Sequence, residues 1–227
     1  MYSIKMMQTE LFNDLNEPPD LSGLSDLFEL SIDAFYAALY ADMSELPIKA
    51  EISRFIEKVK KAGGGFPNAK TANTADARIA ADRAASDRGD PDVFKVLKAA
   101  YKVQHEIHRI TGFLRFNPDS AGVYIARCSP DHFVLPALAE HFTLRFGETP
   151  WAIIDEKRNL CLSREKGEQA RLVPVSKDPA ASLESDDWED LWRLYHRSVN
   201  NEARKNPRLQ RQFMPERYQK YLPETRQ

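Results

Sequence analysis

Apolar residues recur every three or four positions through much of the first half of the chain, which is the spacing of one helix face. This pattern predicts four helices, over 24–39, 48–62, 74–88 and 91–111. The last three each stop at glycine, the residue that most often follows a helix. Residues 1–20 are predicted to form an irregular start that Pro18-Pro19 closes.

After Gly112 the pattern changes to short runs typical of strands. Four strands are predicted, at 112–116, 123–128, 151–154 and 160–162. A helix is predicted between the second and third strands, capped by Ser129 or Asp131, with a kink or a late start near Pro136. No connection demands a parallel crossover. The expected fold is therefore α+β, an antiparallel β-β-α-β-β sheet packed with an N-terminal helical part and a C-terminal helix.

Beyond the strands, the chain is predicted to form a polar linker over 164–185, a helix over 186–204 and a short helix that begins at Pro215. We expect an N-terminal helical region over 1–91. An α+β core with a basic C-terminal helix and tail is expected over 92–227. Together they are expected to form one compact unit.

Composition bounds the classes of function. Hydrophobic residues make up 42% of the 227 residues, which is enough for a sizeable core, and the net charge of −2 announces neither nucleic-acid nor membrane binding. Cys128 and Cys161 are too far apart in sequence for a metal or cluster motif, so two buried thiols and no cofactor are expected. Without a long apolar run or a signal peptide, the chain is expected to be soluble and cytoplasmic, with no membrane partner.

A stripe of positive charge is predicted on the helix over 91–111. Lys98, Lys102, His105 and Arg109 advance by four, three and four positions, so they share one face. Such a row can follow the phosphates of a nucleic acid. The alternative is an ordinary solvated face.

Arg115 interrupts the apolar run GFLRF. If 112–116 is a strand, Phe113 and Arg115 point to the face opposite Leu114 and Phe116. A ring beside a guanidinium can stack a base and hold a phosphate, although a cross-strand ion pair is equally consistent with the pattern. Arg127, just before the SPDH helix cap, is a weaker anion candidate.

The C-terminal part is basic and rich in rings. Between 193 and 226 the chain has nine Lys or Arg residues and three Glu, with Tyr195, Phe213, Tyr218 and Tyr221 among them. This pattern is typical of nucleic-acid contact, but a tail packed on the core with its rings buried would also produce it. The predicted nucleic-acid-binding residues are Lys98, Lys102, Arg109, Phe113, Arg115, Arg127, Arg193, Arg204 and Tyr218.

No catalytic motif identifies an enzyme. His105 and His108 have a spacing that can serve a metal, but no third ligand is marked, and no phosphate loop or nucleophile elbow is present. An enzyme acting on a nucleic-acid base or backbone would need a pocket of His108, His132 and Tyr195. Whether the chain is catalytic stays open at this point.

Two long stretches carry a family resemblance. The first, from His105 to Leu162, contains the G-F-x-R-F run, the Ser-Pro step before Asp131-His132, and R-F-x-x-x-x-W. The second contains L-W-x-x-Y, N-x-A-R, M-P-x-x-Y and L-P. Both resemble an uncharacterised bacterial domain family of proteins associated with DNA metabolism or DNA repair. The positions that match are Gly112, Phe113, Arg115, Phe116, His132, Arg145, Phe146, Trp151, Trp192, Tyr195, Asn200, Ala203, Arg204, Pro215 and Tyr218.

The resemblance implies a context rather than a mechanism. Genes of this family lie beside a radical-SAM protein thought to act on DNA, and the domain is also fused to UdgX-type uracil-DNA glycosylases. It therefore implies a DNA metabolism or repair accessory protein, with DNA and the radical-SAM protein as partners. A pure protein-interaction adaptor for the radical-SAM protein is an alternative. Phe116, Phe146, Trp151 and Trp192 are expected in the core.

Overall fold

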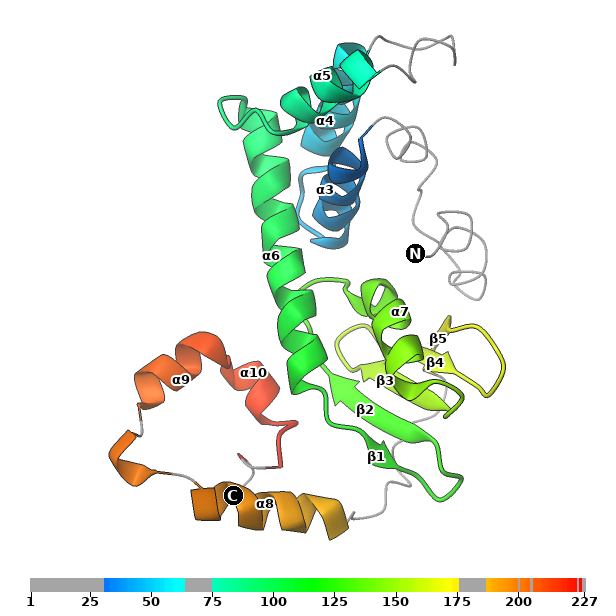
Figure 1. Cartoon of the computed structure of the whole chain (residues 1–227), viewed down its shortest axis with the longest axis vertical. Helices are drawn as coiled ribbons and strands as arrows, with labels where there is room; N and C mark the ends of the chain where they lie inside the picture. Colours follow the sequence, from blue (N-terminus) through cyan, green and yellow to red (C-terminus); the bar gives the residue numbers. More distant parts are fainter. Residues whose placement is uncertain are drawn as a thin grey trace. The chain divides into compact units, whose positions relative to one another are not determined.

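The computed structural model describes residues 31–63, 75–175, 187–199, 201–204, 206–223 and 225 (Figure 1). These residues divide into two compact units. The first unit comprises 31–107 and 131–134, and the second comprises 108–130 and the described residues from 135 onward. The long helix α6, Pro91–Phe113, contributes to both units.

The first unit is helical, as its apolar spacing predicts. Helices α3 (Ile32–Met43), α4 (Lys49–Ala62) and α5 (Ala75–Ala85) pack on one another. Helix α3 begins after Ser31, whose hydroxyl accepts a hydrogen bond from the Ala34 amide at 3.0 Å. The part of the predicted helix over 24–30, the glycines after Gly63 and the predicted irregular start lie outside the described residues.

Helix α4 is amphipathic and its charged side is tied to α6. Ile52, Phe55 and Val59 fill its buried face. On the solvent side, Arg54 donates two hydrogen bonds of 2.8 Å to Asp92. Lys95 reaches Glu51 at 2.9 Å. These exposed pairs add little stability but fix the pairing of the two helices.

The second unit is built on a five-stranded sheet. Its strands, in spatial and chain order, are β1 (Asn117–Pro118), β2 (Tyr124–Cys128), β3 (Trp151–Asp155), β4 (Leu160–Arg164) and β5 (Arg171–Pro174). Helix α7, Leu135–Phe146, joins β2 to β3 and packs against β3 and β4 on one face of the sheet (Figure 1). Because α7 begins at Leu135, the prediction of a late start near Pro136 is confirmed, and the prediction of a cap at Ser129 or Asp131 is wrong.

The prediction of an all-antiparallel sheet is wrong. Strands β2 and β3 are parallel, with Tyr124 opposite Trp151 and Cys128 opposite Asp155. Helix α7 connects β2 to β3 and carries the chain back along the sheet, so β3 starts at the same end of the sheet as β2. The fold is therefore α+β with a mixed sheet, in which the other three strand pairs are antiparallel.

Two local predictions also differ from the structure. The run 112–116 is not a strand, because Gly112 and Phe113 still belong to α6 and the first strand starts at Asn117, between the first two predicted strands. Strand β5 forms within the predicted linker, where it pairs with β4. Its residues Arg171–Pro174 are too few and too mixed to show a strand pattern in sequence.

Aromatic rings fill the core of the second unit. Phe142 and Trp151 are fully buried, with ring centroids 6.1 Å apart. Phe116 lies 5.1 Å from Phe142 and 4.8 Å from Phe146. The core positions predicted for Phe116, Phe146 and Trp151 are confirmed by these contacts.

The chain ends in four short elements. These are α8 (Asp187–Val199), a 3-10 turn (Glu202–Arg204), α9 (Pro207–Phe213) and α10 (Glu216–Gln219). The helix predicted over 186–204 thus ends at Val199, and Asn200 lies outside the described residues. Pro215 caps α10, as predicted for a proline before a short helix.

Candidate nucleic-acid interface

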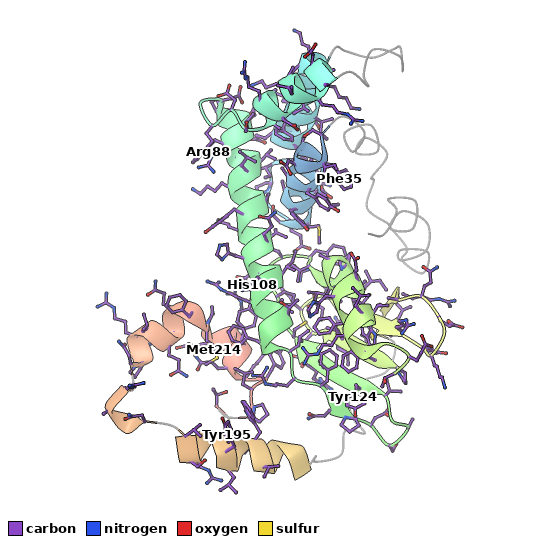
Figure 2. All side chains as sticks on the ribbon, in the orientation of Figure 1. Phe35, Arg88, His108, Tyr124, Tyr195 and Met214 are labelled. Atoms are coloured by element: carbon purple, nitrogen blue, oxygen red, sulfur yellow. The ribbon has the colours of Figure 1, made fainter. Side chains whose placement is uncertain are left out.

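The segment from α8 to α9, hereafter the C-terminal arm, exposes several rings. Trp192 is 41% exposed, Tyr195 55% and Phe213 63%. Trp192 and Tyr195 lie one turn apart on α8, with ring centroids at 5.7 Å (Tyr195 is labelled in Figure 2). The prediction that Trp192 lies in the core is therefore wrong. Its ring is partly exposed to solvent.

Helix α9 buries none of its residues. The Asn206 side chain caps it by accepting a hydrogen bond from the Leu209 amide at 3.0 Å, and Pro207 occupies the first turn. A helix this short is marginal in water unless packing supports it. The exposed surface of α9, which carries Arg208, Arg211 and Phe213, is therefore open for a partner.

The arm carries arginines without a carboxylate partner. Within the described part of the chain, Arg197, Arg204, Arg208 and Arg211 form no ion pair, and all four are exposed. The Arg197 guanidinium donates to the Arg193 carbonyl, at 3.3 Å. Unpaired guanidinium groups beside exposed rings are suited to phosphates and bases.

Two residues predicted to bind nucleic acid lie inward instead. The rings of Phe113 and Tyr218 pack together at 5.5 Å, and Tyr218 is 3% exposed. The Arg217 guanidinium covers the Tyr218 ring at 4.9 Å. This packing leaves no face of Tyr218 for a base. The alternative of a tail with buried rings therefore describes α10, while α8 and α9 keep theirs exposed.

Three predicted arginines have partners within the protein. Arg115 donates to the carbonyls of Gly112 and Leu114, at 2.9 and 3.4 Å, and so closes the C-terminal end of α6. Arg127 pairs with Glu156 at 3.1 Å. Arg193 donates to the Pro223 carbonyl at 3.2 Å, which holds α8 against the end of the chain.

Glu156 joins the sheet to the C-terminal segment. One carboxylate oxygen accepts from Tyr221 at 2.5 Å and from Lys220 at 3.1 Å, and the other pairs with Arg127. Burial raises the pKa of Glu156, but these three donors outweigh burial and lower it overall. Burial, and then the bonded Glu156 carboxylate, raise the pKa of Tyr221, so its hydroxyl remains a donor.

Protonation of this carboxylate is expected to make stability depend on pH. A lowered folded-state pKa means that Glu156 contributes its stability above the unfolded pKa near 4.5 and loses it as the pH falls through the folded value. We expect Glu156→Gln to lower the free energy of unfolding by about 1 kcal/mol at neutral pH, since the site is partly exposed. Urea unfolding from pH 7 to 3 would measure this difference. A difference that persisted at the acid end would contradict the assignment.

Lys98, Lys102 and Arg109 are the other predicted cations, and they form no ion pair with a described residue. Lys98 and Lys102 are exposed on the part of α6 that belongs to the first unit, and Arg109 is half-buried on the part in the second. Lys98 lies 5.9 Å above the Phe94 ring.

The three residues of the candidate pocket have separate surroundings. His132 belongs to the first unit, where its Nδ1 lies 2.9 Å from the Ser44 carbonyl oxygen. His108 is exposed and Tyr195 stacks beside Trp192, both in the second unit. These surroundings supply no argument for an enzyme.

Thiol and metal chemistry find no support in the described ranges. Cys128 and Cys161 are buried thiols, as expected, and burial raises the pKa of Cys161 to about 11. The described residues contain no cluster of three or more His, Cys, Asp or Glu side chains that could hold a metal ion. Among these same residues, no helix has the length and apolar character needed to span a bilayer.

Sequence reasoning did not single out Arg208 and Arg211, which are both exposed. The region 193–226 is basic as a whole, and the neighbouring residues in the sequence do not distinguish these two arginines from Arg193 or Arg217. A signal was present, since PRLQRQF contains few apolar residues for a buried helix. The role of Glu156 had no signal, because its partners Tyr221 and Lys220 are more than sixty positions away.

Comparison with known proteins finds a family. The family model described as domain of unknown function DUF4130 matches residues 73–224. No curated protein and no solved structure matches the chain.

Proposed function

Given that the chain belongs to the DUF4130 family, we propose that it is a nucleic-acid-binding accessory protein of DNA metabolism that uses the C-terminal arm. The single observation that carries the proposal is the exposure of α9. Its Arg208 and Arg211 have no ionic partner among the described residues, and Phe213 is 63% exposed beside them in sequence. The arm also carries Arg204 and the ring pair of Trp192 and Tyr195.

The side chains of the arm are better suited to bind single-stranded DNA than to read the base pairs of a duplex. Exposed rings offer their faces to unpaired bases, and guanidinium groups bind phosphates without regard to sequence. Helix α9 is too short to align many side chains along a groove. We therefore propose single-stranded DNA as the ligand of the arm.

The family resemblance supplies the cellular setting of the proposal. Relatives beside a radical-SAM protein, or fused to uracil-DNA glycosylases, would need a module that holds DNA near the enzyme. In this proposal the chain performs no chemistry itself. Its partner acts on the strand that the arm retains.

We expect the arm to bind a fluorescently labelled single strand with a Kd on the order of 1 µM at about 50 mM salt, within the range of non-specific binding. The double variant Arg208→Ala/Arg211→Ala removes two phosphate contacts. The slope of log affinity against log salt should therefore become shallower by about 1.4, because each single-strand contact contributes about 0.7. Fluorescence anisotropy across a salt series measures both quantities.

A matched control separates specific contacts from general charge. Lys49→Ala/Lys166→Ala removes the same two charges at exposed positions outside the arm. It should leave the salt slope within error of the parent protein. Equal slopes for the two double variants, or no binding at low salt, would refute the proposal.

A protein-binding role is the second candidate. Leu191, Leu194 and Val199 on α8 are more than half exposed. An unpartnered apolar surface of this kind also suits a protein. Capture of the radical-SAM protein after nuclease treatment, abolished by Leu191→Asp but retained in Arg208→Ala/Arg211→Ala, would favour this candidate.

A further inference from the structure

The first unit contains a second aromatic and basic surface, distinct from the arm. An open groove of about 670 Å³ lies between α3 and α6, and Arg88 also lines it (Arg88 is labelled in Figure 2). All of its lining residues belong to the first unit. The groove therefore does not depend on the placement of the arm.

Four rings line this groove. Tyr36 and Tyr40 are one turn apart on α3 and stack at 5.8 Å with an interplanar angle of 29°. Phe94 and Tyr101 line the α6 side and are 49% and 60% exposed. Rings at the surface of a groove offer their faces to a flat ligand.

Small residues and charged side chains complete the groove; the charged ones are Asp33, Arg88 and Lys98. Ala37 and Ala100 contribute short, buried side chains to its lining, which leaves room between the two helices. Lys98, between Phe94 and Tyr101 in sequence, places its ammonium 5.9 Å above the Phe94 ring. Within the described ranges neither Lys98 nor Arg88 has a carboxylate partner. Both charges are available for a ligand anion.

We propose that this groove binds an unpaired base of a nucleic-acid strand, with the base against the tyrosine rings and a neighbouring phosphate on Lys98 or Arg88. Rings flanked by unpaired cations match the flat face and the negative charge of a nucleotide. The open form of the groove favours a nucleotide within a strand, because a free nucleotide is usually enclosed more fully. Burial, and then the neighbouring Tyr36, raise the pKa of Tyr40, so its hydroxyl remains a hydrogen-bond donor.

This inference shares with the proposed function only the class of ligand, since the sites lie in different units. The test uses the full chain and a single strand that carries 5-iododeoxyuridine, whose base crosslinks to stacked side chains under near-ultraviolet light. Mass spectrometry of the digested complex locates the crosslinks. We expect them at Tyr36, Tyr40 or Tyr101, and we expect them to persist in Arg208→Ala/Arg211→Ala. Failure of the arm proposal would therefore leave this result intact.

Variants in the groove provide the second measurement. Tyr101→Ala and Lys98→Ala should each reduce the groove crosslink by about five-fold or more, the lower end of what removal of a stacking ring causes. Lys61→Ala removes a charge from the same unit outside the groove and should have no such effect. Crosslinks found only outside the groove, or unchanged by Tyr101→Ala, would overturn the inference. Competition by thymidine monophosphate as strong as by the strand would overturn the assignment to a strand.

Discussion

Replacing Phe142 by alanine is expected to lower the free energy of unfolding by about 3–5 kcal/mol. Its ring is fully buried and lies within 6.4 Å of the rings of Phe116, Phe146 and Trp151. Removing it leaves a cavity between α7 and the sheet that these neighbours cannot fill, because each is held by its own backbone. Urea unfolding monitored by tryptophan fluorescence measures the loss.

Leu144, two positions along the same helix, is the matched control. It is 77% exposed, so Leu144→Ala should change the free energy of unfolding by less than about 0.5 kcal/mol. If the two variants lost similar stability, α7 would not pack on the sheet by the face that carries Phe142.

Replacing Glu106 by alanine is expected to cost about 3 kcal/mol of stability, since each hydrogen bond to a buried charged group contributes about 1.5–3 kcal/mol. Glu106 is 3% exposed, and its two carboxylate oxygens accept from the backbone amides of Asp131 and His132 at 2.9 and 2.8 Å. This one side chain thereby fixes the SPDH segment against α6. Without it, both amides lose the carboxylate that accepts from them.

Hydrogen exchange identifies this effect locally. In Glu106→Ala the amides of Asp131 and His132 should exchange much faster, whereas Glu106→Gln keeps one acceptor oxygen and should protect one of them. Glu57→Ala, at an exposed position on α4, is the control and should leave both amides protected. Unchanged protection in Glu106→Ala would show that the hydrogen bonds contribute nothing to this segment.

Local sequence signals located the helices well. The glycine stop and the apolar spacing placed α4 within one residue of its observed start at Lys49, and Asp90-Pro91 marked the beginning of α6. These features involve residues within one or two helical turns of each other, so they can be recognised from a single sequence. Gly112 was misleading because α6 continues through it to Phe113. A glycine at the end of a helix is tolerated when the next residues still pack.

The sequence predicted the chemical character of the candidate site but not which of its side chains are exposed. A basic, ring-bearing C-terminal part was evident from composition, and the arm has this character. Tyr218 and Phe213 looked equivalent in sequence, yet one is 3% exposed and the other 63%. Which ring turns inward depends on Phe113, more than one hundred positions away.

The sequence by itself determined the helical spacing of the first unit, the aromatic content of the sheet core and the surplus of arginine near the C-terminus. Only the tertiary structure decided the direction of β3, the inward position of Tyr218, the intramolecular partners of Arg115 and Arg127, and the groove between α3 and α6. The physical reason is the range of the forces concerned. Periodicity and capping act between neighbours in the chain, whereas strand pairing, ion pairing and groove formation join residues that only folding brings together.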